Sequence, residues 1–185
     1  AKIKPRDTQA AAVNIRGLIS AVSEIRKMTG LRPKEFCPQI KKCLADCGIA
    51  LVFLPHLKGS FLQGASFMDG NKIVVGLTAR GKDADKFWFS LFHEFAHISL
   101  GHVGRPNGTS EDDEKAADQW SADTLIAAED FEAFKGKGDY SERSVFQFAR
   151  SQGIAPGIVV GRMQLEGMIQ YSMLNHLKEK YEIAV

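Results

Sequence analysis

The stretch FWFSLFHEFAHISLGH, residues 87–102, contains the pattern His-Glu-x-x-His at positions 93–97. Residues four apart in an α-helix lie on one face, about 6 Å apart along the axis, so His93 and His97 can approach one metal ion. Glu94 lies about 100° around the helix from His93, where it can reach a water on that ion more easily than the ion itself. We therefore predict His93 and His97 as metal ligands and Glu94 as a catalytic base.

The same stretch is predicted to form a buried helix. Asp83 or Asp85 can cap its start, and Gly101 stands where it should end. Its apolar residues point in several directions, which indicates burial on most sides: Phe87, Trp88, Leu91, Phe92, Phe95 and Ile98. Ionisable side chains in a buried helix are costly without a partner, and a metal ion is a partner that suits this spacing. The alternative is that two histidines of the core match the motif by chance, and we favour it less.

A catalytic zinc ion usually has three protein ligands and one open position, so a third ligand is needed. The spacing HExxHxxGxxH fails, because the chain has Leu100 and Val103 at the required positions and His102 lies one residue too early. A glutamate on the following helix is the other solution. Glu114 fits it, and Asp118, one turn later, can accept a hydrogen bond from a ligand histidine. Acidic residues are also common near helix starts, so spacing alone leaves both roles open.

The whole chain is expected to form one domain, residues 1–185: a helical segment at 1–48, a sheet with the metal-site helices at 49–128, and a helical segment at 129–185. Its net charge of +2 indicates no polyanionic partner, so we expect no direct binding of nucleic acid. No apolar run approaches the roughly 20 residues that span a bilayer. The first residues, AKIKPRDTQAAAV, lack a signal-peptide pattern, and we expect a cytoplasmic location.

Three cysteines fall in one segment, at Cys37, Cys43 and Cys47. A second metal site there would lack a fourth ligand, so buried free thiols in a reducing compartment are the favoured interpretation.

The remaining pattern predicts an α+β fold, with a small, mostly antiparallel sheet packed on a bundle of helices. A buried strand is predicted at 49–54, and strands at 60–68 and 72–77 flank the hairpin signal Asp69-Gly70-Asn71. The helix after the metal motif should begin at Thr109 or Ser110, with Asp113 completing a capping pair. Other helices are predicted from Asp7 or Thr8 to about Met28, and at 38–48, 141–151, 156–165 and 171–181.

Residues 87–102 and the segment EKAADQWSADTLI, residues 114–126, resemble the two signature helices of the ImmA/IrrE family of metallopeptidases. That family has an HExxH helix followed by Glu-x-x-Ala-Asn/Asp-x-aromatic-x-Ala, matched here by Glu114, Ala117, Asp118, Trp120 and Ala122. The resemblance implies a zincin-like arrangement of the gluzincin type, with Glu114 as the third zinc ligand. Ala127 departs from the family's usual proline.

Two further segments, IALVFLPHLKGS at 49–60 and IAPGIVVGRMQ at 154–164, resemble the branch of the family found in HigA-like regulators. Members of that branch often carry the domain after a helix-turn-helix DNA-binding domain. The resemblance thus implies a protein substrate, such as a transcriptional repressor or an antitoxin.

The function expected from this sequence is that of a zinc-dependent endopeptidase, with zinc held by His93, His97 and Glu114. Mn²⁺ and Fe²⁺ stay open as alternatives, because two histidines and one carboxylate also suit iron. Tyr140, Tyr171 and His102 are unranked candidates for an oxyanion donor, and the strand at 72–77 is the expected site of substrate pairing. The competing hypothesis is a metal-binding module of a toxin–antitoxin or Xre-type regulator, without proteolysis.

Overall fold

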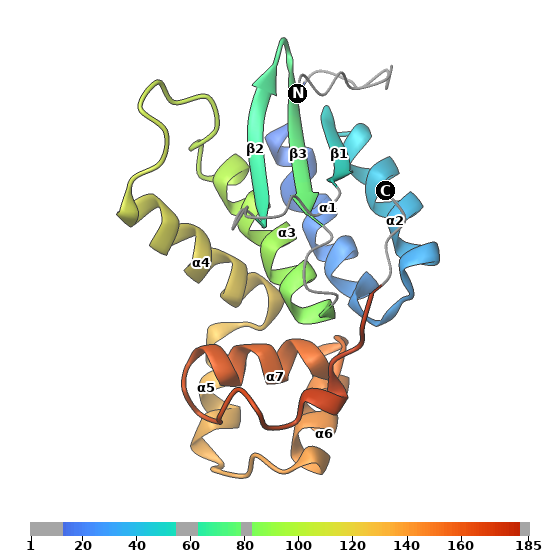
Figure 1. The fold of residues 1–185 in the computed structure, drawn as a ribbon, viewed down its shortest axis with the longest axis vertical. Coiled ribbons are helices and arrows are strands. Elements are labelled where there is room, and N and C mark those ends of the chain that lie inside the picture. The colour runs from blue at the N-terminus through green and yellow to red at the C-terminus, as the bar shows by residue number, and fades with distance from the viewer. Residues whose placement is uncertain (1–12, 55–62, 79–82, 182–185) are drawn as a thin grey trace.

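The computed structural model describes residues 13–54, 63–78 and 83–181. Its helices are α1 (Ile15–Lys27), α2 (Pro33–Ala45), α3 (Ala84–Ser99), α4 (Glu111–Leu125), α5 (Ala128–Gly136), α6 (Glu142–Gln152) and α7 (Pro156–Leu165), with short 3₁₀ helices η1 (Met28–Gly30) and η2 (Asn175–Leu177). The strands are β1 (Ile49–Leu54), β2 (Gly64–Asp69) and β3 (Lys72–Thr78). In Figure 1 the sheet and α1–α4 occupy the upper part of the molecule, and α5–α7 lie below them.

The predicted α+β class is confirmed, but the sheet is mixed rather than mostly antiparallel. Its strand order is β1-β3-β2. β2 and β3 form the predicted antiparallel hairpin, with Asp69 paired to Lys72 and Gly70 at φ +60° in the turn. β1 pairs with β3 in parallel, from Ile49↔Ile73 onward. A continuous apolar run such as β1 is typical of a buried parallel strand, which is the arrangement found here.

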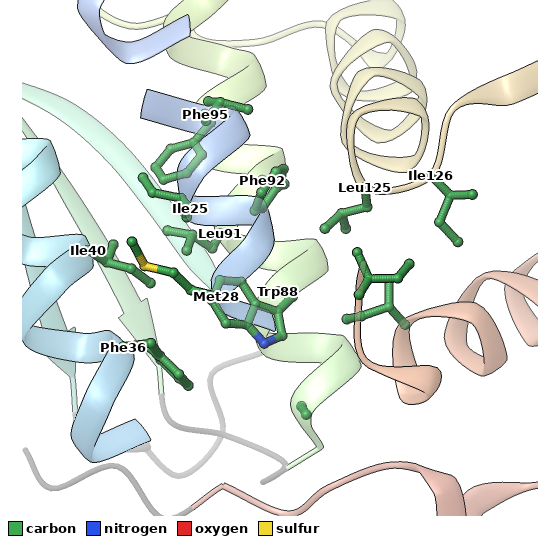
Figure 2. Close-up of a cluster of buried hydrophobic side chains, with 14 of the residues drawn as sticks. Ile25, Met28, Phe36, Ile40, Trp88, Leu91, Phe92, Phe95, Leu125 and Ile126 are labelled. Carbon is green, nitrogen blue, oxygen red and sulfur yellow. The ribbon is translucent and has the colours of Figure 1, made fainter. Parts of the chain in front are cut away.

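Helix α3 lies at the centre of the core. It contacts α1, α4 and α7 and strands β2 and β3. Trp88, Leu91, Phe92 and Phe95 are each 0% exposed, which confirms the predicted burial of this helix on several sides. Figure 2 shows these side chains between Ile25, Met28, Phe36 and Ile40 on one side and Leu125 and Ile126 on the other.

Several helix boundaries differ from the predictions. α1 begins at Ile15, where the Asn14 side chain accepts a hydrogen bond from the backbone N–H of Gly17; the predicted caps Asp7 and Thr8 lie outside the described residues. α2 begins at Pro33 instead of residue 38, because proline suits the first helical turn and the Glu35 carboxylate accepts the N–H of Arg32. The helices predicted at 141–151 and 156–165 correspond to α6 and α7.

The helix predicted at 171–181 is wrong. Leu174 has φ 56°, which interrupts a helix, and the carbonyls of Tyr171 and Met173 accept hydrogen bonds from the Gln164 side chain. These contacts with α7 leave only the short η2. α5 was not predicted at all. Within the described ranges, no helix combines the length and the apolar character needed to cross a bilayer.

Tyr181 supplies a test of the core. Its hydroxyl oxygen accepts a hydrogen bond of 2.9 Å from the buried indole Nε1–H of Trp88. Tyr181→Phe should therefore lower the free energy of unfolding by about 1–3 kcal/mol, because a buried donor loses its acceptor. Urea unfolding measures the change. Tyr171→Phe is the control, since Tyr171 is 69% exposed and should change stability by less than about 0.5 kcal/mol. Equal stability of wild type and Tyr181→Phe would contradict the prediction.

The same tyrosine gives a pH prediction. Burial raises the pKa of Tyr181 from 10.0 to about 12. As the pH rises, the tyrosine therefore ionises in the unfolded chain before it ionises in the folded protein. The stabilisation that the neutral phenol provides is present below pH 10.0 and is lost as the pH rises towards 12. The stability advantage of wild type over Tyr181→Phe should shrink across this window in urea titrations at several pH values. A constant advantage would show that the phenol ionises equally easily in both states.

Candidate metal centre

The candidate site lies where α4 packs on α3 beside strand β2. Of the two predicted caps, Thr109 and Ser110, it is Ser110 that caps α4: its hydroxyl oxygen accepts the N–H of Asp113, and the Asp113 carboxylate accepts the N–H of Ser110. Ala117 and Ser121 are buried where α4 meets α3, and the Ser121 hydroxyl donates to the Phe89 carbonyl across the two helices. These small residues let α4 approach α3 closely, so the first turn of α4 reaches the histidines.

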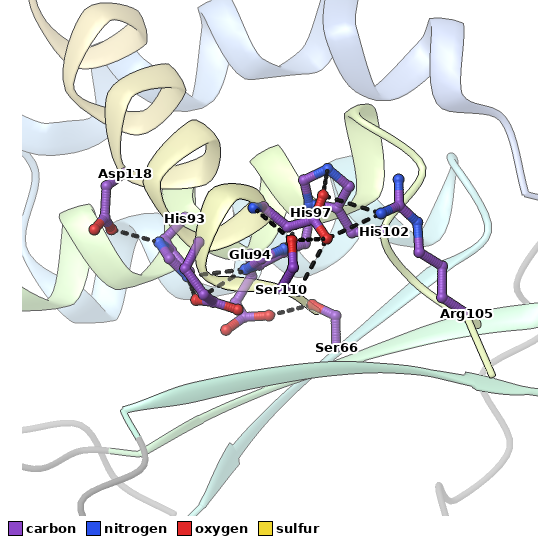
Figure 3. Close-up of polar contacts among 10 residues, drawn as sticks. Ser66, His93, Glu94, His97, His102, Arg105, Ser110 and Asp118 are labelled. Atoms are coloured by element: carbon purple, nitrogen blue, oxygen red, sulfur yellow. Dashed lines mark hydrogen bonds and ion pairs between the residues drawn. The ribbon is translucent and has the colours of Figure 1, made fainter. Parts of the chain in front are cut away.

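The structure brings His93, His97 and Glu114 together. Their ligand atoms all lie within 4.8 Å of one another, and no other group of three metal-binding side chains occurs among the described residues. The two Nε2 atoms are 2.9 Å apart, and Glu114 Oε2 lies 3.2 Å from His93 Nε2 and 3.6 Å from His97 Nε2. Asp118 Oδ1 lies 2.8 Å from His93 Nδ1, as expected for an acid that orients a ligand histidine (Figure 3).

This geometry fits a divalent metal ion. Bonds of about 2.0–2.1 Å in a tetrahedral arrangement place ligand atoms about 3.3–3.4 Å apart, and the three observed separations lie around that value. The Asp118 carboxylate can only accept, so the neutral His93 ring carries its proton on Nδ1 and turns the Nε2 lone pair towards Glu114. A divalent cation between these two acceptor atoms would satisfy both of them.

The charge states also suit a metal ion. A hydrogen bond from the Thr109 hydroxyl and the nearby histidines lower the pKa of Glu114, which keeps it a carboxylate. Burial lowers the pKa of His97, and a positive charge on His93 whenever that ring is protonated lowers it further, which keeps the His97 imidazole neutral. Metal ions bind these deprotonated forms.

Glu94 is enclosed and lines the same cavity as the three candidate ligands. It is 5% exposed, and burial raises the pKa of its carboxyl group. The Ser66 hydroxyl of β2 donates to Glu94 Oε2 (Figure 3). A Cβ on Gly64 would lie only 2.6 Å from Glu94 Oε1, so the β2 backbone is in direct contact with the acid. We did not predict Ser66 or Gly64; a glycine within a strand was the available signal of close approach.

A cleft runs past the cluster in two adjoining cavities, of about 260 Å³ and about 480 Å³. Both are lined by Gly64, His93, Glu94 and Glu114. The smaller continues to Val103 and Thr109, and the larger to Phe89 and Leu165. The cleft therefore extends to both sides of the candidate metal position.

The predicted substrate strand needs a correction. β3 is the central strand, and both of its edges are occupied by β1 and β2. β2 is the edge strand on the side of Glu94.

Of the three oxyanion candidates, His102 alone lines a cavity together with the candidate ligands. Both ring nitrogens of His102 have partners, His97 and Asp113. The Tyr140 hydroxyl donates to the Lys135 carbonyl, and Tyr171 lines a different cavity, which none of the three candidate ligands lines.

Taken with the α+β fold, an HExxH helix whose histidines meet a glutamate of the next helix is the arrangement of a metallopeptidase. The family model described as Peptidase_M78, IrrE N-terminal-like domain, matches residues 48–164, and the chain belongs to this family. The family implies a divalent metal ion and a protein substrate. No curated protein matches the chain.

Metal binding tests the cluster directly. Glu114→Ala should nearly abolish Zn²⁺ binding measured by competition with a chelator, because one of three ligands is lost. Asp118→Ala should weaken binding by about 10–100-fold, because His93 loses the acceptor that orients it. Glu111→Ala is the matched control: it lies in the same first turn of α4, outside the cluster, and should bind as wild type does. Unchanged affinity in Glu114→Ala would remove this residue from the site.

Proposed function

We propose that this chain is a zinc-dependent endopeptidase that hydrolyses a peptide bond in a specific protein partner. The observation that supports it most is the division of roles at the site. The ligand atoms of His93, His97 and Glu114 lie within 4.8 Å of one another. The Glu94 carboxylate is not part of this group: it accepts a hydrogen bond from Ser66 and lines the same cavity. Hydrolysis needs these two components, a ligand set and a separate base.

Zinc bound at this site would activate a water molecule and polarise the scissile carbonyl. Glu94 accepts the proton of the attacking water and passes it to the nitrogen of the leaving amine. The raised pKa of Glu94 suits both steps, because an acid with a pKa nearer to neutrality accepts and releases a proton readily. Ser66 holds the carboxylate in one orientation while the proton moves.

The edge strand β2 offers the substrate a backbone to pair with. An extended peptide added to β2 would run along the cleft past Glu94, and main-chain hydrogen bonds would hold it there. A cleft that extends to both sides of the candidate metal position suits an internal segment of a protein chain. The resemblance to HigA-associated proteins supports a transcriptional repressor or an antitoxin as that partner, in the cytoplasm, with any DNA binding outside this chain.

Glu94→Gln tests the reaction. The amide keeps the shape of the side chain but cannot accept the proton, so cleavage should fall by about 10²–10⁴-fold while Zn²⁺ affinity stays within a few-fold. Zinc-loaded wild type and Glu94→Gln are each added to an extract of the source cells, and new amino termini are labelled and sequenced. New termini that appear only with the wild-type protein, and that are absent when a chelator is added, identify the substrate. Equal cleavage by Glu94→Gln would refute Glu94 as the base. Zinc binding without new termini would favour the non-proteolytic regulatory module.

Gly64→Ala tests the contact between β2 and the base. The added Cβ would lie 2.6 Å from Glu94 Oε1, so the carboxylate must move. A displacement near 1 Å can cost about 10²-fold in rate, and we expect a loss of that size with Zn²⁺ affinity retained. Gly30→Ala is the control, because an added Cβ there meets nothing within 4 Å. Full activity of Gly64→Ala on the substrate identified above would show that this contact does not position Glu94.

A further inference from the structure

His102 is a buried histidine that the proposed reaction does not use. It is 7% exposed and follows the end of α3. Its Nδ1 lies 2.9 Å from Nδ1 of His97, and its Nε2 lies 3.2 Å from Oδ1 of Asp113. Both polar atoms of the ring are therefore engaged, one with a candidate metal ligand and the other with an acid of α4.

The directions of these hydrogen bonds follow from Asp113. Its carboxylate accepts hydrogen bonds from the Arg105 guanidinium at 3.0 Å and from the backbone N–H and hydroxyl of Ser110. Because a carboxylate only accepts, Nε2 of His102 carries the proton. The neutral ring then has a lone pair on Nδ1, so His97 must donate from its own Nδ1–H. His97 Nε2 is left with its lone pair towards His93 and Glu114.

We propose that His102 is a positioning residue for the metal ion. Through its contact with His97 it fixes the tautomer and the ring orientation of that ligand, and through Asp113 it connects the ligand to the start of α4. This inference rests on the proposed metal site, and it adds His102 as the residue that keeps the ligand His97 in its orientation.

The two histidines of α3 are supported in different ways. His93 contacts Asp118 directly, and the Asp118 side chain is 71% exposed. His97 reaches Asp113 through the His102 side chain, which is 6% exposed. Hydrogen bonds removed from water are stronger and more costly to break, so the connection through His102 should hold its ligand more firmly.

Asp113 gives the connection a second effect. The same carboxylate caps α4, and the next residue is Glu114. The contact that orients His97 therefore also fixes the turn that presents the third candidate ligand. Loss of His102 should disturb two of the three ligands.

Three variants test the proposal by Zn²⁺ affinity, measured by chelator competition. His102→Phe keeps a ring of similar size but removes both hydrogen bonds, and should weaken binding by about 10–100-fold. His102→Asn keeps an acceptor near the position of Nδ1 but does not reach Asp113, so its loss should be smaller. His176→Phe is the matched control at an exposed histidine that pairs with Glu142, and should bind as wild type does. Co²⁺ spectra of the same proteins report whether the ligand geometry changes.

Nitrogen NMR of the imidazoles in wild type gives a readout that needs neither a variant nor a substrate. In the zinc-loaded protein, His97 should carry its proton on Nδ1 and His102 on Nε2. A His102 proton on Nδ1, or a folded His102→Phe with affinity within about 2-fold of wild type, would overturn the proposal. Wild type that binds no Zn²⁺ would instead refute the metal site itself. If His102→Phe does not fold, the NMR result in wild type decides.

Discussion

The imidazoles of His93 and His97 belong to a helix that packs most of its other side chains into the apolar core, and the rest of the site depends on this burial. Both rings line the cleft, and the ring nitrogens that do not face the candidate metal position have partners within the protein. Helix α4 supplies these partners as Asp118 for His93 and, through His102, Asp113 for His97. The contact between α3 and α4 is thus as much a set of hydrogen bonds as an apolar interface.

About one and a half turns of α4 carry three acidic residues that make three different contacts. The spacing of these residues along the helix decides which contact each one makes. The Asp113 carboxylate lies at the start of the helix, where it accepts the backbone N–H of Ser110 and contacts His102. Glu114, the next residue around the helix, reaches both Nε2 atoms. Asp118 lies one turn beyond Glu114 and meets the Nδ1 side of His93. A shift of one residue in this helix would exchange these contacts, so the cap at Ser110 fixes the register of the site as well as the helix.

The sequence was sufficient for the features that one helix or one hairpin determines. The HExxH spacing, the cap at Ser110 and the turn at Gly70 depend on neighbouring residues, and each lies where it was predicted. The position of β3 in the middle of the sheet and the contact of Gly64 with Glu94 depend on how distant segments meet. His102 was considered for its spacing and as an oxyanion donor, but its contact with Asp113 was not predicted, because the sequence does not show that the end of α3 and the cap of α4 are adjacent.

The helices beyond α4 also bear on the site, through the buried Arg162 of α7. Its guanidinium donates to the carbonyls of Ala122 and Ile126 at the end of α4, and it stacks on the Phe131 ring at 4.3 Å. The Ala122 carbonyl also accepts the backbone N–H of Ile126, and a cation at the carboxyl end of a helix interacts favourably with the helix dipole. α4 is therefore fixed at both ends, by its cap at the metal site and by Arg162 at the other. The contacts of Arg162 are the physical reason to regard α7 as part of the metal-site framework, and the region matched by the family, residues 48–164, includes both anchors of α4.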